Sequence, residues 1–123
     1  MIEEKDPLTE RIIACCFKVH SELGPGFNEK LYLNALKLAL RKENLSCETE
    51  KEFEVFFQNK KIGILRTDLV VERKAIVEVK ALTGNVPDVF KYQVLSYLKA
   101  ANLKVGLLVN FGNKSCQIKR LMF

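Results

Sequence analysis

TDLVVERKAIVEVKAL, residues 67–82, contains two runs rich in β-branched residues separated by three charged ones. The runs, 67–71 and 75–82, alternate with the period of two that is typical of strands, and three residues suffice to reverse the chain between them. We therefore predict an antiparallel hairpin. Its loop length sets the register, which places Leu69 and Val77 together on a buried face.

The predicted register also brings two acidic residues together. Val70 lies across from Ile76, and Asp68 lies across from Glu78 on the same face. Two carboxylates whose Cβ atoms are about 5 Å apart repel each other, so at least one should have a raised pKa and a divalent cation would relieve the repulsion. Lys80 projects from the same face, where its ammonium group can hold an attacking water and stabilise charge on phosphorus.

Two helices are predicted upstream of this hairpin. Asp6 followed by proline is a helix start, and the apolar residues that follow have helical spacing over about 7–22. The glycines and proline of residues 24–26 end that helix. Asn28 can cap a second helix, which should end near Asn44.

A strand meander over 46–82 is predicted next, followed by a third helix that opens at Pro87-Asp88 and two strands over 104–111 and 116–123. The predicted order is ααβββ(β)αββ. The chain has no repeats and no linker-like segment, so we expect one α/β (α+β) domain over residues 1–123.

Composition indicates the class of protein and its cellular location. It has 123 residues, of which 48% are hydrophobic and 28% charged, as in an ordinary globular domain. The acidic start does not resemble a signal peptide, and no apolar run is long enough to cross a bilayer, so we expect a cytoplasmic protein without membrane association. The four cysteines lack metal-site spacing and are expected to be buried free thiols: Cys15, Cys16, Cys47 and Cys116.

Charge is distributed unevenly along the chain. The net charge is +5, and no acidic residue follows Asp88. A basic C-terminal third suits a polyanionic partner such as DNA or RNA, although a solvated basic surface has the same composition. The candidate phosphate contacts are Lys91, Lys99, Lys114 and Arg120.

The acidic and basic residues described above resemble a known signature. Asp68 followed by Glu78-Val79-Lys80, with Glu29 on a preceding helix, is similar to the PD-(D/E)XK nuclease superfamily, although Thr67 stands where that name has proline. Residues 26–32, GFNEKLY, fit the pattern of the GxxExxY proteins, a small branch of that superfamily. The resemblance covers essentially the whole chain.

The resemblance implies a fold and a set of roles. The fold is an αβββαβ core with a mixed central sheet flanked by helices, here with an extra N-terminal helix and C-terminal strand. Asp68 and Glu78 would bind Mg²⁺ or Mn²⁺, Glu29 would be an auxiliary carboxylate at the metal, and Lys80 would act on the nucleophilic water. The superfamily also carries a Q-xxx-Y element on the following helix.

Gln93 and Tyr97 match that element, and the resemblance implies that Gln93 orients the substrate or the lysine, with Tyr97 as an auxiliary residue. Tyr32 and His20 fall on apolar helix faces, where we expect them to be packed with their polar atoms hydrogen-bonded. Asn110, near a strand end, either approaches the site or ends the strand.

Two functions follow as hypotheses. The first is hydrolysis of phosphodiester bonds in DNA or RNA through attack of a metal-activated water, by an endo- or exonuclease. The alternative is a nucleic-acid-binding or protein-interaction module that retains the fold without useful turnover. Retention of the Asp68, Glu78 and Lys80 set favours the enzyme, because a structural role does not need a pair of like charges. A homodimer is compatible with the sequence.

Overall fold

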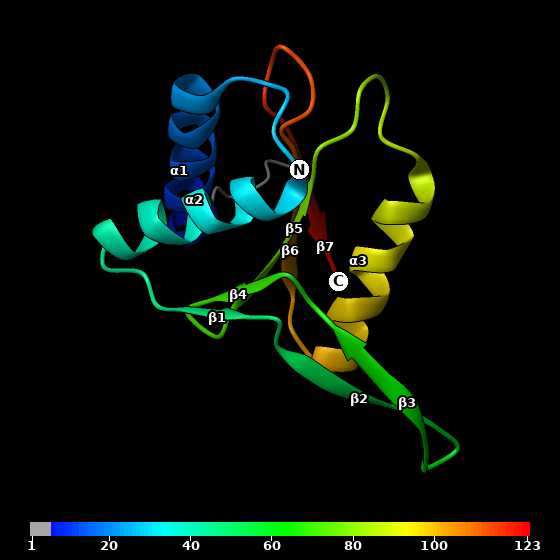
Figure 1. Cartoon of the computed structure of the whole chain (residues 1–123). Helices are drawn as coiled ribbons and strands as arrows, with labels where there is room; N and C mark the ends of the chain where they lie inside the picture. The colour runs from blue at the N-terminus through cyan, green and yellow to red at the C-terminus, as the bar shows by residue number, and fades with distance from the viewer. Residues whose placement is uncertain (1–5) are drawn as a thin grey trace, which may run out of the picture.

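The computed structural model describes residues 6–123 and shows helices on both sides of a mixed sheet, with a hairpin that extends away from the body (Figure 1). The elements in chain order are α1 (Pro7–Leu23), α2 (Glu29–Lys42), β1 (Cys47–Thr49), β2 (Glu52–Phe57), β3 (Lys60–Arg66), β4 (Leu69–Val71), β5 (Ala75–Lys80), α3 (Asp88–Ala101), β6 (Val105–Asn110) and β7 (Gln117–Met122).

Both N-terminal helices begin at the predicted caps. The carboxylate of Asp6 accepts a hydrogen bond from the N–H of Leu8 at 3.1 Å, and Pro7 occupies the first position of α1. The side-chain oxygen of Asn28 accepts one from the N–H of Leu31 at 3.1 Å. These bonds satisfy backbone N–H groups that a helix leaves unpaired at its start.

Five strands form the main sheet, in the order β1-β4-β5-β6-β7. β5 and β6 are parallel and the other neighbours are antiparallel, so the sheet is mixed, as predicted. The parallel pair is joined by α3, the helical crossover that parallel neighbours require. At Gly106 in β6, a Cβ atom would lie 2.8 Å from Cγ1 of Val94, so any other residue here would require this side chain of α3 to shift.

The central hairpin has the predicted register. Leu69 pairs with Val77, and Val70 pairs with Ile76. Three or four strands were predicted before α3. This number was wrong, because the meander divides into five strands. The chain leaves the main sheet at Glu50, whose φ of 53° is left-handed, and β2 and β3 then pair only with each other before β4 returns to the main sheet.

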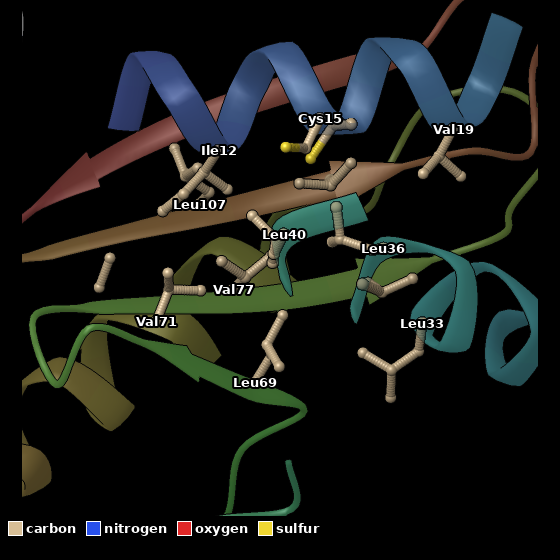
Figure 2. Packing of buried hydrophobic residues seen from close by; sticks show 14 of the residues in the cluster. Ile12, Cys15, Val19, Leu33, Leu36, Leu40, Leu69, Val71, Val77 and Leu107 are labelled. Atoms are coloured by element: carbon tan, nitrogen blue, oxygen red, sulfur yellow. The ribbon is translucent and has the colours of Figure 1, made fainter. Parts of the chain in front are cut away.

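Two apolar clusters cover the two faces of the sheet. α1 and α2 pack on one face, where side chains such as Ile12 and Leu36 meet Val77 and Leu107 (Figure 2). α3 packs on the other face, over Ile76 and its neighbours. Both faces of the central hairpin are therefore buried, whereas the alternation in the sequence singled out only one of them as buried.

The predicted free thiols and the predicted packed histidine are both present, but two of the four thiols are less buried than predicted. Cys15 and Cys16 are buried, but Cys47 and Cys116 are only half-buried, and all four are free thiols. His20 is buried, and its Nε2 lies 2.8 Å from the carbonyl oxygen of Asn113, as expected for a packed, hydrogen-bonded side chain. Within residues 6–123, no helix is both long and apolar enough to cross a membrane.

Candidate active site

Asp68, directly before β4, and Glu78, on the middle strand β5, are held against each other within the main sheet. The backbone N–H of Asp68 donates to Oε1 of Glu78 at 2.9 Å, and Oδ2 of Asp68 accepts from the N–H of Val79 at 2.8 Å. Each carboxylate thus bonds the backbone of the opposite segment. Just before Asp68, Thr67 is buried, and its N–H and hydroxyl both donate to the carbonyl of Lys51, so a hydrogen-bonded threonine anchors the position where the superfamily's name has proline.

The environment of Glu78 is unusual for a carboxylate. Its side chain is on β5 beneath α3, and only 4% of the residue is exposed. Burial, followed by the negative charge of Asp68 and a hydrogen bond between the two carboxyl groups, raises the pKa of Glu78 to about 8, although Lys80 opposes the rise. The predicted raised pKa of one carboxylate is confirmed. A proton or a cation is needed to balance this pair.

Lys80 lies two residues farther along β5, at its last position. The side chain is half-buried, and Nζ lies 4.3 Å above the centroid of the Phe90 ring on α3. A cation over an aromatic face is attracted by the ring quadrupole, which holds the ammonium group near the sheet end without neutralising it with an acidic partner.

The helix α3 brings Tyr97 close to the acidic pair. Burial raises the pKa of Tyr97, and the negative charges of Glu78 and Asp68 raise it further. Gln93, one turn earlier, hydrogen-bonds to the Tyr97 side chain, and this contact partly opposes the rise. The two residues of the predicted Q-xxx-Y element therefore interact with each other, and the tyrosine feels both carboxylates.

A small hollow borders the other side of Asp68. Its volume is about 170 Å³, and it is lined by Glu29, Lys30, Leu33, Glu50, Asp68 and Val79. Glu29 is exposed at the first position of α2 and so shares this hollow with Asp68. Within residues 6–123, however, no three His, Cys, Asp or Glu side chains come together closely enough to hold a metal ion. Glu29 lies on the exposed rim of this hollow, whereas Glu78 is buried under α3.

Glu50 lines the same hollow and was not singled out by the sequence. Its N–H donates to the carbonyl of Asp68 at 3.1 Å, and its carboxylate forms an ion pair of 3.6 Å with Lys30 of α2. The residue lies between two short strands in a left-handed conformation. No motif marks such a position, so only the folded chain brings it to the site.

Tyr32 connects the start of α2 to the end of β5. It is fully buried, its hydroxyl donates to the carbonyl of Gly24, and it accepts from the N–H of Phe27 at 3.2 Å. The prediction of a core tyrosine with a satisfied hydroxyl is confirmed. The loop that it holds includes Gly26, whose φ of 115° is unfavourable for residues with a side chain. The last residue of the GFNEKLY segment thus fixes the loop that precedes Glu29.

Asn110 stabilises the chain just after β5 instead of reaching the acidic pair. Its side-chain oxygen accepts from the N–H of Leu82 at 2.8 Å, and its side-chain nitrogen donates to the Leu82 carbonyl at 2.9 Å. Gly112 lies against the same segment, where a Cβ atom would approach the Leu82 backbone to 2.3 Å. These contacts position the segment that links Lys80 to α3.

The basic residues predicted to contact phosphates are spread over the C-terminal third. Lys91 borders a hollow of about 190 Å³ beside β7, and its Nζ lies 5.3 Å from the centroid of the Tyr92 ring. Lys99 and Lys114 are exposed, on the last turn of α3 and in the loop between β6 and β7. Arg120 is half-buried on β7.

A mixed sheet that brings two carboxylates together beside its middle strand, next to a lysine two residues beyond one of them, defines an α+β domain of the nuclease type. The sequence profile of the PD-(D/E)XK nuclease superfamily matches residues 6–121, and the chain belongs to this superfamily.

Comparison with solved structures supports the fold. A crystal structure of a protein named SSO0001 resembles this chain with a TM-score of 0.55 and 18% sequence identity, over 99% of this chain and 69% of the other. At this identity the likeness concerns the fold alone. Among curated proteins, no sequence matches the chain significantly.

Proposed function

We propose that this chain is a divalent-metal-dependent nuclease that hydrolyses phosphodiester bonds in DNA or RNA. The observation that carries the proposal is the contact between Asp68 and the buried Glu78, with Lys80 on the same strand. A buried pair of like charges destabilises a fold unless a cation or a proton balances it. Strongly perturbed carboxylates therefore mark functional sites more often than structural ones.

The donor atoms of the pair fit Mg²⁺ or Mn²⁺. Carboxylate oxygens are hard ligands, and Mg²⁺ is commonly held by one or two carboxylates while waters and substrate phosphates complete its shell. Asp68 and Glu78 would hold the ion, and Glu29 would act from the rim of the hollow as an auxiliary carboxylate. Bound there, the cation would stabilise charge on the phosphate oxygens and lower the pKa of a water molecule.

The neighbouring side chains have the chemistry that such a reaction needs. The Lys80 ammonium group would orient the attacking water and stabilise the negative charge that grows on the phosphate. Gln93 is half-buried one turn from Tyr97 on α3 and would orient the substrate or Lys80. Lys91, Lys99 and Lys114 would contact phosphates farther along the nucleic acid.

Two finer assignments belong to the same proposal. The GFNEKLY segment, with a glycine at positive φ and a tyrosine that holds the loop, supports membership of the GxxExxY branch. The cytoplasm is the proposed location, on the basis of the free thiols.

One observation favours an alternative function. The pKa of Glu78 is raised to about 8, so this carboxyl group can keep a proton at neutral pH, and the chain then also fits a nucleic-acid-binding or protein-interaction module that keeps the fold without turnover. In that case the proton on Glu78, instead of a metal ion, would balance the pair.

Incubation of the full chain with labelled single- and double-stranded DNA and RNA, with Mg²⁺, Mn²⁺ or EDTA, distinguishes the two functions. We expect metal-dependent cleavage that is lost in Asp68→Asn and Lys80→Ala and kept in Glu43→Gln, which changes an exposed carboxylate at the C-terminal end of α2. Binding without cleavage in the wild type under every condition would support the alternative.

A further inference from the structure

The β2–β3 ribbon carries a large apolar surface that no part of residues 6–123 covers. It extends from the body of the protein (Figure 1), and four of its large apolar residues are more than half exposed: Phe56 at 58%, Phe57 at 61%, Ile62 at 65% and Ile64 at 53%. A two-stranded ribbon alone is marginally stable in water, and grouped exposed apolar residues mark interaction sites. The ribbon therefore has the features of a docking surface.

Near the body of the protein the two faces of this ribbon differ, whereas at the tip both Phe56 and its neighbour Phe57 are exposed. On the inner face, Phe53 lies across from Leu65 and packs on the cluster beneath α3. On the outer face, Ile64 lies across from Glu54. The register shifts between Val55 and Phe56, and beyond this bulge Phe56 pairs with Lys61, whose ammonium group reaches Glu54, so Phe56 adjoins the outer face.

The charges on the outer face are already paired within the ribbon. Glu52 and Arg66 form an ion pair at 2.9 Å, and Glu54 and Lys61 form one at 3.3 Å. The face around Ile64 therefore carries no net charge. A nucleic acid would need unpaired basic residues to replace its counterions, so this face does not suit a polyanion.

The same neutrality suits a second copy of the chain. With a net charge of +5, two copies repel each other over most of their surfaces. A locally neutral patch with an apolar centre is a place where they can approach, and a two-fold interface requires a patch that is complementary to itself.

A large apolar depression elsewhere on the protein is less suitable than the ribbon for binding a second copy. It lies between α1 and α2, has a volume of about 540 Å³, and includes the exposed Leu38. Its rim carries Lys18, Arg41 and Lys42 against a single acid, Glu22. Two copies meeting there would bring like charges together.

We propose that the outer face of the β2–β3 ribbon is a homodimer interface, in which the ribbons of two copies pack about a two-fold axis and bury Phe56, Ile62 and Ile64. This inference goes beyond the proposed nuclease function and does not depend on it.

Sedimentation equilibrium of the full chain over a wide concentration range tests the interface. We expect the wild type to dimerise and Ile64→Lys to weaken association roughly tenfold or more, because a buried apolar anchor is lost and two like charges are brought together. Leu38→Lys, which changes an equally large and exposed apolar residue on α2, should associate like the wild type.

Further measurements test the interface even if the substitution Ile64→Lys disrupts the ribbon. Ile64→Thr retains a β-branched side chain, and it should also weaken association while the circular dichroism spectrum stays unchanged. Amide hydrogen exchange in residues 52–66 should slow as the wild-type concentration rises.

A monomeric wild type at every concentration would overturn the proposal, as would wild-type association of both Ile64 variants. Weaker nucleic-acid binding by Ile64→Lys in a monomeric protein would make the ribbon a nucleic-acid surface instead. Cleavage assays on Asp68→Asn remain independent of all these outcomes.

Discussion

Tyr32 and Phe111 are stacked face to face, with ring centroids 4.7 Å apart and planes inclined by only 5°. The N–H of Phe111 donates to the carbonyl of Lys80 at 2.9 Å, so the tyrosine is joined through one residue to the lysine of the site. Its hydroxyl at the same time bonds the loop before Glu29. Tyr32 thus sets the position of α2 relative to the end of β5.

Tyr32→Phe should loosen the loop without removing the stack. The carbonyl of Gly24 and the N–H of Phe27 lose their partner, which should reduce the free energy of unfolding by about 1–3 kcal/mol. Denaturant unfolding measures this loss, and amide exchange in residues 24–28 should become faster. Tyr92→Phe, at an exposed tyrosine on α3, is the matched control and should change neither quantity.

Glu78 should make the metal-free protein less stable as pH rises. Its pKa is about 8 in the folded state and 4.5 when unperturbed, so between these values the folded state retains a proton that the unfolded state has lost. The stabilising contribution is therefore complete below about pH 4.5 and decreases until the pH passes about 8. Metal-free melts of the wild type and Glu78→Gln at several pH values test this, since the substituted protein should lack this decline.

Comparison of the two proteins isolates the effect, because the other acids remain in both. Hydrogen bonds act in the opposite direction elsewhere: contacts with Lys51 lower the pKa of Glu48, and Ser46 lowers that of Glu72, so the stability that these two acids contribute is present at neutral pH and is lost only as the pH falls below their usual range. Glu43→Gln should keep the wild-type pH dependence. A wild type and a Glu78→Gln protein with parallel stability curves would mean that Glu78 is not buried as an acid.

Divalent cations should stabilise the wild type through its acidic pair. A ligand at about 100 times its dissociation constant adds roughly 2.7 kcal/mol, which corresponds to several degrees in melting temperature for a domain of this size. Asp68→Asn and Glu78→Gln should lose most of this gain, although removal of one charge can stabilise the metal-free protein. The measurement is a thermal melt with Mg²⁺, Mn²⁺ and EDTA, again with Glu43→Gln as control. Identical responses in all four proteins would exclude the pair as metal ligands.

Nucleic-acid binding should weaken steeply with salt. Each neutralised phosphate contributes a slope of about −0.9 to the logarithm of the affinity against the logarithm of salt concentration on duplex DNA. Lys91→Gln, Lys99→Gln and Lys114→Gln should each make that slope less steep by the amount that about one phosphate contact contributes, as fluorescence anisotropy at two ionic strengths would show. Lys42→Gln, at an exposed lysine at the end of α2, is the control outside the acid-free C-terminal third. An affinity that does not change with salt would make the basic excess a solvated surface.

Residues close together in the chain determined much of this fold. Asp6 and Asn28 cap their helices as predicted, because a cap bonds N–H groups two or three residues away. The pairing of Val70 with Ile76 was predictable for the same reason, since the three-residue loop sets the register of its hairpin. With that register, the meeting of Asp68 and Glu78 also followed from the sequence.

Tertiary structure alone decided what covers each side chain. Alternation along β5 places Ile76 and Glu78 on one face, but only the packing of α3 makes that face buried and raises the pKa of Glu78. The separation of the β2–β3 ribbon, the position of Glu50 at the hollow and the stack of Tyr32 on Phe111 likewise depend on segments far apart in the chain. Periodicity defines the faces of a strand or helix, whereas burial and electrostatics depend on which distant element packs against each face.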